Sequence, residues 1–471
     1  MNEHGQGLPP AFVRALQQQF QAQQLMLSEA ERWTYGYDNS RQHALPGVVV
    51  CPSSREEVAS LLALCHHHSI PLVVRGSGTG TAGAAVPVCH GVVLSTERLN
   101  RILKVDPDNR TMVVEPGVTN QQVQLAAAEH GFFWPPDPTS AAVCTVGGNL
   151  ACNAAGPRAV KYGTPRENVL GLCAVTADGR PFTTGTYTTK GVVGYDLTRL
   201  LIGSEGTLAV ITEATLKLTP LAECKRTLRA LYQDMDSAAR AVSRIMAQPV
   251  TPCALEFMDG QALAMIRGYA ENDLPEEAGA LLMIEVDGPA ACIDGAAHAV
   301  VEAAGGKGCI EVLLADTEQK VSALWTLRKA LSPALRTVAP KKINEDVVVP
   351  VSNIPVLIEG IGELSRRYGI TIVNFGHAGN GNIHVNLLID PDDVTQLADA
   401  EACLSELFDL VLQLQGTLSG EHGIGMVKRQ YVSRELDPVA LQLMQQLKHQ
   451  FDPEGLLNPG KAIPDGGSTL L

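Results

Sequence analysis

Two motifs near the C-terminal end of the chain contain residue types that can bind a metal ion. The first runs from His377 to His384 and reads HAGNGNIH, so a Gly-Asn-Gly-Asn turn separates two imidazoles. On a single strand these histidines would face opposite sides, whereas a hairpin with this turn would bring them together. The second motif, SGEHGIG, supplies Glu421 and His422 between glycines. Two imidazoles and a carboxylate are a common site for zinc, manganese or iron.

A cationic helix is predicted upstream of both motifs. Trp325 to Arg328 reads as part of a helix, and Lys341 and Lys342 precede the acidic run that ends at Asp346. A lone arginine on a helix is most often a surface cation, and a lone histidine more often has a structural role. Beside a metal site, however, a guanidinium that binds a carboxylate through two hydrogen bonds would suit an organic acid.

Three glycine-rich segments in the first half predict contact with a large ligand. The first follows a strand and runs from Arg75 to Gly80, where several backbone N–H groups could point into one concavity, as a pyrophosphate requires. It lacks the helix and acidic residue of the Rossmann fingerprint. The second joins the prolines at 135–138 to small residues at 146–156, and the third runs from Ile202 to Thr212. Each could be a structural turn alone, but three together favour a ligand.

The composition narrows the classes of protein. The chain has 471 residues and a formal net charge of −14 at pH 7, which argues against nucleic acid as a partner. Its 11 cysteines form no C-x-x-C pair, so we expect no iron–sulfur cluster and a reducing, cytoplasmic compartment. No apolar run approaches the roughly 20 residues that span a bilayer, so we expect no transmembrane segment. Contact with the inner membrane would then be peripheral and through a partner.

The apolar pattern predicts an α+β protein with two kinds of domain. A helix over 11–27 opens the chain, and strand–helix–strand from 47 to 74, two hairpins and a helix over 120–130 follow. From 228 to 315 the order is β-α-β, β-α-β, the split pattern of a ferredoxin-like layer. We expect an N-terminal helical segment (1–41), a first domain (42–220), a second domain (221–425) and a C-terminal segment (426–471).

Together these segments resemble the FAD-linked D-lactate, glycolate and D-2-hydroxyglutarate dehydrogenases, a branch of the vanillyl-alcohol oxidase superfamily. The resemblance covers about 41–461 and includes the closing run FDPEGLLNPGK, which ends at Lys461. It implies a two-subdomain PCMH-type FAD-binding domain, a ferredoxin-like α/β cap domain for substrate and metal, and a C-terminal segment that returns to the FAD domain. Because no histidine lies between Arg75 and Thr81, the FAD is expected to be noncovalent.

The resemblance also assigns residues to roles. His377, His384 and Glu421 would bind the metal, with zinc preferred over manganese or iron, and His422 would be the catalytic base. Arg328 would hold the substrate carboxylate, with Asn386 and Lys342 as further substrate contacts. The residues expected to contact FAD are Arg75, Gly76, Ser77, Gly78, Thr79, Gly80, Pro136, Asp137, Ser140, Gly147, Gly148, Asn149, Asn153, Ala154, Glu205, Gly206, Ile211 and Asn458.

These roles imply the oxidation of a small D-2-hydroxy acid to the 2-oxo acid. His422 would take the hydroxyl proton while hydride passes to flavin N5, with the substrate oriented by the metal and Arg328. D-lactate or glycolate is favoured, because relatives that act on a dicarboxylate have a lysine where this chain has Asn344. D-2-hydroxyglutarate is the main alternative, because Lys341 and Lys342 are close in sequence.

Two other classes of protein share the expected FAD domain. A non-redox flavin enzyme of the alkyl-glycerone-phosphate synthase type would not reduce its flavin with substrate. A subunit that binds FAD without catalysis would be expected to lack the base or a metal ligand. For the favoured dehydrogenase, reduced FAD would pass its electrons to a separate quinone, cytochrome or electron-transfer protein or subunit. A homodimer is compatible with the sequence.

Overall fold

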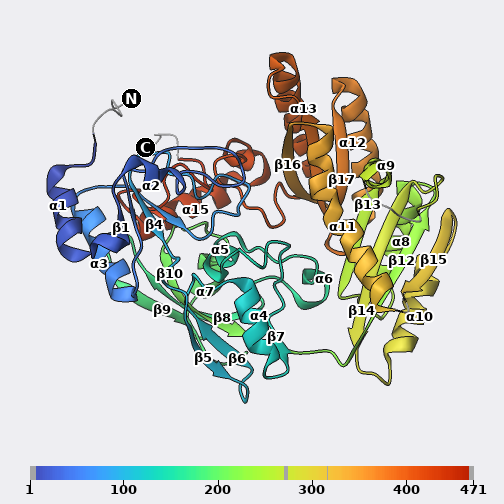
Figure 1. Ribbon diagram of the computed structural model, residues 1–471, viewed down its shortest axis with the longest axis horizontal. Helices are drawn as coiled ribbons and strands as arrows, with labels where there is room; N and C mark the ends of the chain where they lie inside the picture. Colours follow the sequence, from blue (N-terminus) through green and yellow to red (C-terminus); the bar gives the residue numbers. More distant parts are fainter. Residues whose placement is uncertain (1–6, 270–273, 316, 466–471) are drawn as a thin grey trace. The chain divides into compact units, whose positions relative to one another are not determined.

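The computed structural model describes residues 7–269, 274–315 and 317–465, which belong to two compact units. Unit 1 comprises 1–155, 163–221 and 421–471, and unit 2 comprises 156–162 and 222–420 (Figure 1). The chain therefore passes from one unit to the other at four points, the last of them between Gly420 and Glu421. This last passage lies inside the SGEHGIG motif.

The first sheet of unit 1 has the strand order β1-β2-β4-β3. Strand β4 (Val92–Ser95) lies parallel to both β2 (Val48–Val50) and β3 (Leu72–Arg75), and β1 (Leu25–Met26) pairs antiparallel with β2. The helix predicted over 11–27 is wrong in its second half. Helix α1 (Pro10–Gln19) ends where Phe20 becomes extended, because Leu25 and Met26 instead pair with the apolar strand β2.

The second sheet of unit 1 is antiparallel and has the order β5-β6-β10-β8-β9. It contains both predicted hairpins, β5 (Ile102–Asp106) with β6 (Thr111–Val114), and β8 (Val169–Val175) with β9 (Pro181–Gly185). Strand β10 (Val210–Lys217) lies between them. A short ladder joins β7 (Phe132–Phe133) and β11 (Thr219–Pro220). The other helices of the unit are α2 (Glu29–Trp33), α3 (Arg55–His67), α4 (Asn120–Ala128), α5 (Val146–Cys152), α7 (Leu197–Leu201), α14 (Val432–Glu435) and α15 (Pro438–Phe451).

The C-terminal segment packs into the core of the first sheet. Leu457 is fully buried among the side chains of β2, β3 and α3. The N–H of Leu72 donates to the carbonyl of Leu456, and the N–H of Asn458 donates back to the carbonyl of Leu72. The run FDPEGLLNPGK is therefore a structural part of unit 1.

Unit 2 is built on one seven-stranded antiparallel sheet with the order β15-β12-β14-β13-β17-β18-β16. Its first four strands have the predicted ferredoxin-like arrangement, with α8 (Met235–Ala247) after β12 and α10 (Ile293–Ala304) after β14. The sequence did not predict that three further strands would extend this sheet. The strands are β12 (Cys224–Tyr232), β13 (Ala254–Asp259), β14 (Ala280–Gly288), β15 (Cys309–Ala315), β16 (Lys341–Val348), β17 (Thr371–His377) and β18 (Asn382–Ile389).

Helices cover both faces of this sheet. One face packs against α8, α10, α12 (Ile354–Tyr368) and α13 (Val394–Gln413), and the other against α9 (Gly260–Tyr269) and α11 (Glu318–Val338). The short α6 (Ala159–Tyr162) also contacts β13. The face under α9 and α11 carries an apolar core that includes Met258, Met283 and Phe375. Because side chains alternate along a strand, both histidines of the first motif share this face.

Candidate metal and substrate site

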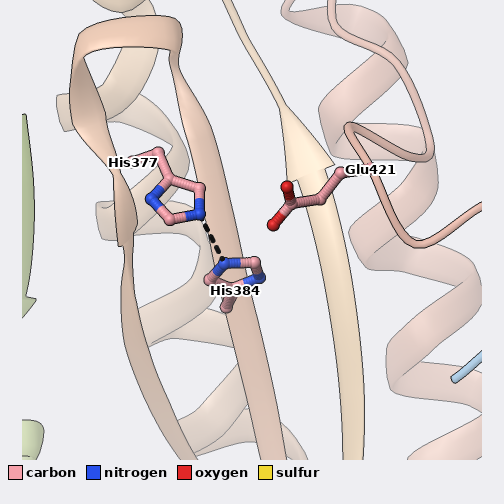
Figure 2. Close-up of side chains that lie close together, drawn as sticks. All are labelled: His377, His384 and Glu421. Carbon is pink, nitrogen blue, oxygen red and sulfur yellow. Dashed lines mark hydrogen bonds between the residues drawn. The ribbon is translucent and has the colours of Figure 1, made fainter. Parts of the chain in front are cut away.

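The hairpin of β17 and β18 brings the two histidines of the first motif together. The register pairs Phe375 with His384 and His377 with Asn382, so both imidazoles lie on one face of the sheet. Their Nε2 atoms are 3.4 Å apart and both residues are buried. Figure 2 shows the two rings nearly perpendicular, with these nitrogens toward each other. Two imidazole nitrogens that face each other at this distance cannot both carry a proton. They can share one proton in a hydrogen bond, or both can direct lone pairs at one metal ion.

Glu421 completes a possible set of three ligands. One of its carboxylate oxygens and one nitrogen of each histidine all lie within 4.8 Å of one another. Figure 2 shows the carboxylate on the same side as the imidazoles. Zinc binds nitrogen and oxygen ligands at about 2 Å, so the three side chains would close further around a bound ion. The residues present therefore fit a divalent metal, and within the described residues they are the only such group.

A buried carboxylate holds the backbone immediately before Glu421. Asp346 on β16 is fully buried and accepts hydrogen bonds from the Ser419 hydroxyl at 3.0 Å and the Gly420 N–H at 2.8 Å. In the β16–β18 register it lies opposite His384. Because Glu421 follows Gly420 directly, these contacts within unit 2 determine where its side chain begins. Sequence analysis did not assign this role, because Asp346 is 73 positions from Ser419.

A second buried carboxylate holds the backbone after His422, within unit 1. Glu205 accepts hydrogen bonds from the N–H groups of Ile424 and Gly425, at 2.6 and 2.8 Å. Burial raises the pKa of Glu205, although these two N–H groups oppose that effect. His422 itself is partly exposed. The predicted base therefore lies in a short segment that is fixed on both sides, and its catalytic role stays a prediction.

Arg328, the predicted substrate anchor, is bound to a residue that sequence analysis missed. Its Nε donates to Glu256 Oε2 at 2.9 Å, and its guanidinium lies 4.7 Å from the centre of the Phe375 ring. The other oxygen of Glu256 is hydrogen-bonded to His377 Nδ1. Burial opposes ionisation of Glu256, but the neighbouring His377 and Arg328 lower its pKa overall. A glutamate in the middle of the apolar strand β13 was the signal that could have identified it.

The other predicted substrate contacts lie on the same face of the sheet as His384. Asn386 is fully buried, and its Nδ2 donates to the carbonyls of Val373 and His384. Its Oδ1 accepts from Asn344, the opposite residue on β16, at 2.7 Å. Lys342 is partly exposed two residues earlier on that strand. The Asn386 amide is therefore hydrogen-bonded to groups of the sheet. Contact of Asn386 or Lys342 with substrate stays a prediction.

The first glycine-rich segment forms a loop that Arg75 supports. The guanidinium of Arg75 is buried and donates to the backbone carbonyls of Thr34 and Tyr37. Gly78 has a φ of 67°, and a Cβ at this position would collide with that guanidinium. Contact of this loop with FAD, through backbone or side chain, is a prediction for Arg75, Gly76, Ser77, Gly78, Thr79 and Gly80.

The structure brings the second glycine-rich segment against this loop. A Cβ on Gly76 would collide with the hydroxyl of Thr145, which caps α5 by accepting the N–H of Gly148. Helix α5 ends at Asn153, whose φ is 54° and whose side chain accepts the N–H of Arg166. Among the other predicted FAD contacts of this segment, Gly147 and Asn149 lie in α5 and Ala154 follows its C-cap, while Pro136, Asp137 and Ser140 lie between β7 and α5, where the N–H of Asp137 donates to the carbonyl of Ala155.

The third glycine-rich segment meets β3 and the C-terminal segment. Asn458 Nδ2 donates to the carbonyls of Glu205 at 2.6 Å and Ala84 at 3.1 Å. Gly206 has a φ of 69° and packs against Val74 on β3, and Ile211 lies on β10. Three segments far apart in sequence therefore converge in unit 1, as a single ligand would require.

Comparison with known proteins gives the family. A model of the FAD binding domain matches residues 46–185, and a model of the C-terminal domain of FAD linked oxidases matches residues 221–462. The glycolate oxidase subunit GlcD of Bacillus subtilis (strain 168) is 40% identical, covering 92% of this chain and 93% of its own. A D-lactate dehydrogenase of Archaeoglobus fulgidus is 40% identical, covering 88% and 91%.

Among solved structures, p-cresol methylhydroxylase with substrate bound matches with a TM-score of 0.79 at 18% identity, covering 97% of this chain and 96% of that one. This likeness concerns the fold alone. The chain belongs to the FAD-linked oxidases, and its fold is similar to that of p-cresol methylhydroxylase, so the predicted family and fold class are confirmed. It is an FAD-dependent oxidoreductase. Within the described residues, no helix combines the length and apolar character needed to cross a bilayer.

Proposed function

We propose that this protein oxidises a small D-2-hydroxy acid, D-lactate or glycolate, to the corresponding 2-oxo acid. The proposal rests chiefly on one observation: three residues that could hold a metal ion are linked to the guanidinium of Arg328 through His377 and Glu256. Two close relatives are named for glycolate and D-lactate oxidation. A 2-hydroxy acid has a hydroxyl that a metal can bind, a carboxylate that a guanidinium can bind and a hydride that a flavin can accept. The proposed site would supply all three groups.

The residues of the site divide the work of the reaction. His377, His384 and Glu421 would hold a divalent metal, zinc by preference, and such an ion lowers the pKa of a bound hydroxyl. Arg328 binds the substrate carboxylate through its Nη nitrogens, which its hydrogen bond to Glu256 does not use. His422 takes the hydroxyl proton, and FAD, bound noncovalently, would supply the acceptor for the hydride of the substrate carbon. A separate quinone, cytochrome or electron-transfer protein or subunit would reoxidise the flavin.

The contacts of Asn344 favour a monocarboxylate. In dicarboxylate-specific relatives a lysine is expected here, but this amide donates to Asn386 and offers no positive charge. D-2-hydroxyglutarate is the second candidate, because Lys342 shares the same face of β16. The two candidates differ in one carboxylate, so the substrate itself can distinguish them.

Anaerobic flavin absorbance tests the proposal. We expect the bound flavin to bleach with D-lactate or glycolate, and not with L-lactate, and to bleach far less after chelation. Bleaching by D-2-hydroxyglutarate alone would select the second candidate. A protein with bound FAD and metal that no 2-hydroxy acid bleaches would contradict the proposal and favour a non-redox flavin reaction.

A further inference from the structure

Glu256 occupies a position that links two parts of the proposed site. Its side chain is 2% exposed and lies on β13, opposite His377 in the β13–β17 register. One carboxylate oxygen faces His377 Nδ1, and the other accepts the Nε–H of Arg328 at 2.9 Å. The residue therefore contacts both a proposed metal ligand and the proposed substrate anchor.

We propose that Glu256 is a positioning residue that couples metal binding to recognition of the substrate carboxylate. The inference rests on the proposed function, since it takes His377 as a metal ligand and Arg328 as the anchor. A carboxylate can only accept hydrogen bonds, so His377 must carry its proton on Nδ1. Its Nε2 lone pair then faces His384 Nε2, so these two nitrogens could hold one metal ion.

The same carboxylate sets the orientation of the guanidinium. Its bond to Nε fixes one edge of the planar group, and the Phe375 ring lies 4.7 Å from it. The two Nη nitrogens remain outside this bond and can form the parallel pair of hydrogen bonds that a carboxylate needs. Loss of the Glu256 carboxylate would therefore disturb both His377, the proposed metal ligand, and Arg328, the proposed anchor of the substrate carboxylate.

A neighbouring glutamate offers a matched control. Glu285 on β14 is also buried, and it accepts from the Trp325 indole at 2.8 Å and the Thr227 hydroxyl at 2.9 Å. Trp325 and Arg328 lie one turn apart on α11, so both glutamates help to dock this helix on the sheet. Within the described residues, the partners of Glu285 are Thr227, Trp325 and Lys225, and none is a histidine.

The experiment compares wild-type protein with Glu256→Gln and Glu285→Gln. Zn²⁺ affinity is measured by competition with a chromophoric chelator, FAD content by absorbance, and KM and kcat with D-lactate. A glutamine offers one acceptor oxygen in place of two, so we expect E256Q to weaken Zn²⁺ binding by about 10–100-fold. We also expect KM to rise by roughly tenfold or more, with FAD content unchanged. E285Q should bind Zn²⁺ as the wild type does.

Three results would overturn the role proposed for Glu256 in whole or in part. Equal Zn²⁺ affinity in E256Q and wild type overturns the inference, and so does an equal loss in E285Q, which would indicate a general effect of docking α11. Weaker Zn²⁺ binding with an unchanged KM overturns the link to Arg328. If E256Q does not fold, Glu256→Asp keeps the charge but is too short for both partners, and the same comparison applies.

The design also separates this inference from the proposed function. If no D-2-hydroxy acid reduces the wild-type flavin, yet E256Q still loses Zn²⁺ relative to E285Q, the proposed function fails and the positioning of His377 stands. If the wild type is reduced and E256Q binds Zn²⁺ normally, the inference alone fails. A wild-type protein that binds no divalent metal overturns both.

Discussion

His422 and Glu421 are adjacent residues with different proposed tasks, and buried carboxylates flank them. Asp346 binds the Ser419 hydroxyl and the Gly420 N–H through the contacts described above, and Glu205 binds the backbone of Ile424 and Gly425. Buried carboxylates that accept several N–H groups make a loop rigid at the cost of their own desolvation. The position of the segment that carries Glu421 and His422 therefore depends on two carboxylates, Asp346 and Glu205, which have no proposed contact with substrate.

Replacement of His422 by alanine tests its role as the base. We expect FAD content to be unchanged and flavin reduction by the preferred D-acid to slow by about 100-fold or more, the usual effect of losing a general base. Rapid-mixing absorbance under anaerobic conditions measures the rate. His449→Ala, which changes an exposed histidine on α15, should reduce at the wild-type rate. An unchanged rate in H422A would rule out this assignment.

Asp259 gives a prediction about pH and stability. Its carboxylate caps α9 through the Ala262 N–H and binds the N–H and amide of Asn374, and burial raises its pKa from 3.8 to about 6. In the unfolded chain this carboxyl ionises near its ordinary pKa of 3.8, so the folded protein keeps the proton up to a higher pH than the unfolded chain does. This contribution to stability is full below pH 3.8 and is lost as the pH rises through 6.

The Asp259→Asn variant isolates that contribution. Two pKa units correspond to about 3 kcal/mol, so the wild type should lose stability relative to D259N between pH 4 and pH 7. Melting temperatures of both proteins across this range provide the measurement. Parallel pH profiles for the two proteins would show that Asp259 does not titrate as described.

At the scale of elements, the hairpin β17–β18 was predictable and the sheet around it was not. The apolar runs on both sides of the Gly-Asn turn predicted two strands and the convergence of His377 with His384, which the structure confirms. The partnership of His377 with Glu256 joins residues 121 positions apart and depends on β13 lying beside β17. No local pattern specifies that neighbour, because strand order follows from packing of the whole unit.

The glycine loops show the same limit in unit 1. Their composition predicted close approach of the backbone to a ligand, which stays a prediction; the structure shows that Gly76 also lies close to Thr145, where a Cβ would collide with the hydroxyl. The sequence did not reveal that Glu205 would bind Ile424 and Gly425, because those residues are more than 200 positions away. The error in the first helix has a local cause, since the amphipathic pattern continued past Phe20 while the chain turned to form β1.

The turn of the hairpin provides a prediction at this scale. Gly381 has a φ of 74°, and a Cβ there would overlap the carbonyl oxygen of Val349. Gly381→Ala should cost at least about 1–3 kcal/mol for the left-handed backbone and weaken Zn²⁺ binding by displacing His384. Thermal melting and the chelator competition measure these effects.

A second glycine gives the opposite expectation. Gly362 lies within α12, where the nearest atom to an added Cβ is the flexible end of Arg366 at 3.8 Å. Gly362→Ala should therefore raise stability by about 0.5–1 kcal/mol, because alanine restricts the unfolded chain and favours helix. A lower melting temperature for G362A would contradict the argument for α12, and an unchanged or higher melting temperature for G381A would contradict the argument for the hairpin turn.

At the scale of the whole molecule, the two units have separate apolar cores and separate proposed ligands. The segments predicted to bind FAD lie in unit 1, and two of the three proposed metal ligands lie in unit 2. A ligand stabilises the unit that binds it by about 2.7 kcal/mol at a concentration 100 times its Kd. The two units should therefore respond to different ligands.

Calorimetry of the apoprotein tests this expectation. We expect two unfolding transitions, one that excess FAD moves to higher temperature and one that Zn²⁺ moves. A single transition for apoprotein, or two that move together with either ligand, would show that the units unfold as one cooperative body. In that case single-residue effects on stability would report on the whole chain.

The register of β17 and β18 constrains how the gene for this protein can change length. Because side chains alternate along a strand, adding or deleting one residue between His377 and His384 would turn the second imidazole to the opposite face of the sheet, under α12 and α13. Substitutions in this turn alter strain by degrees, whereas a one-codon insertion or deletion would abolish the pair of imidazoles at once. Among functional descendants of this chain, we therefore expect that turn to keep its residue count even where its composition drifts.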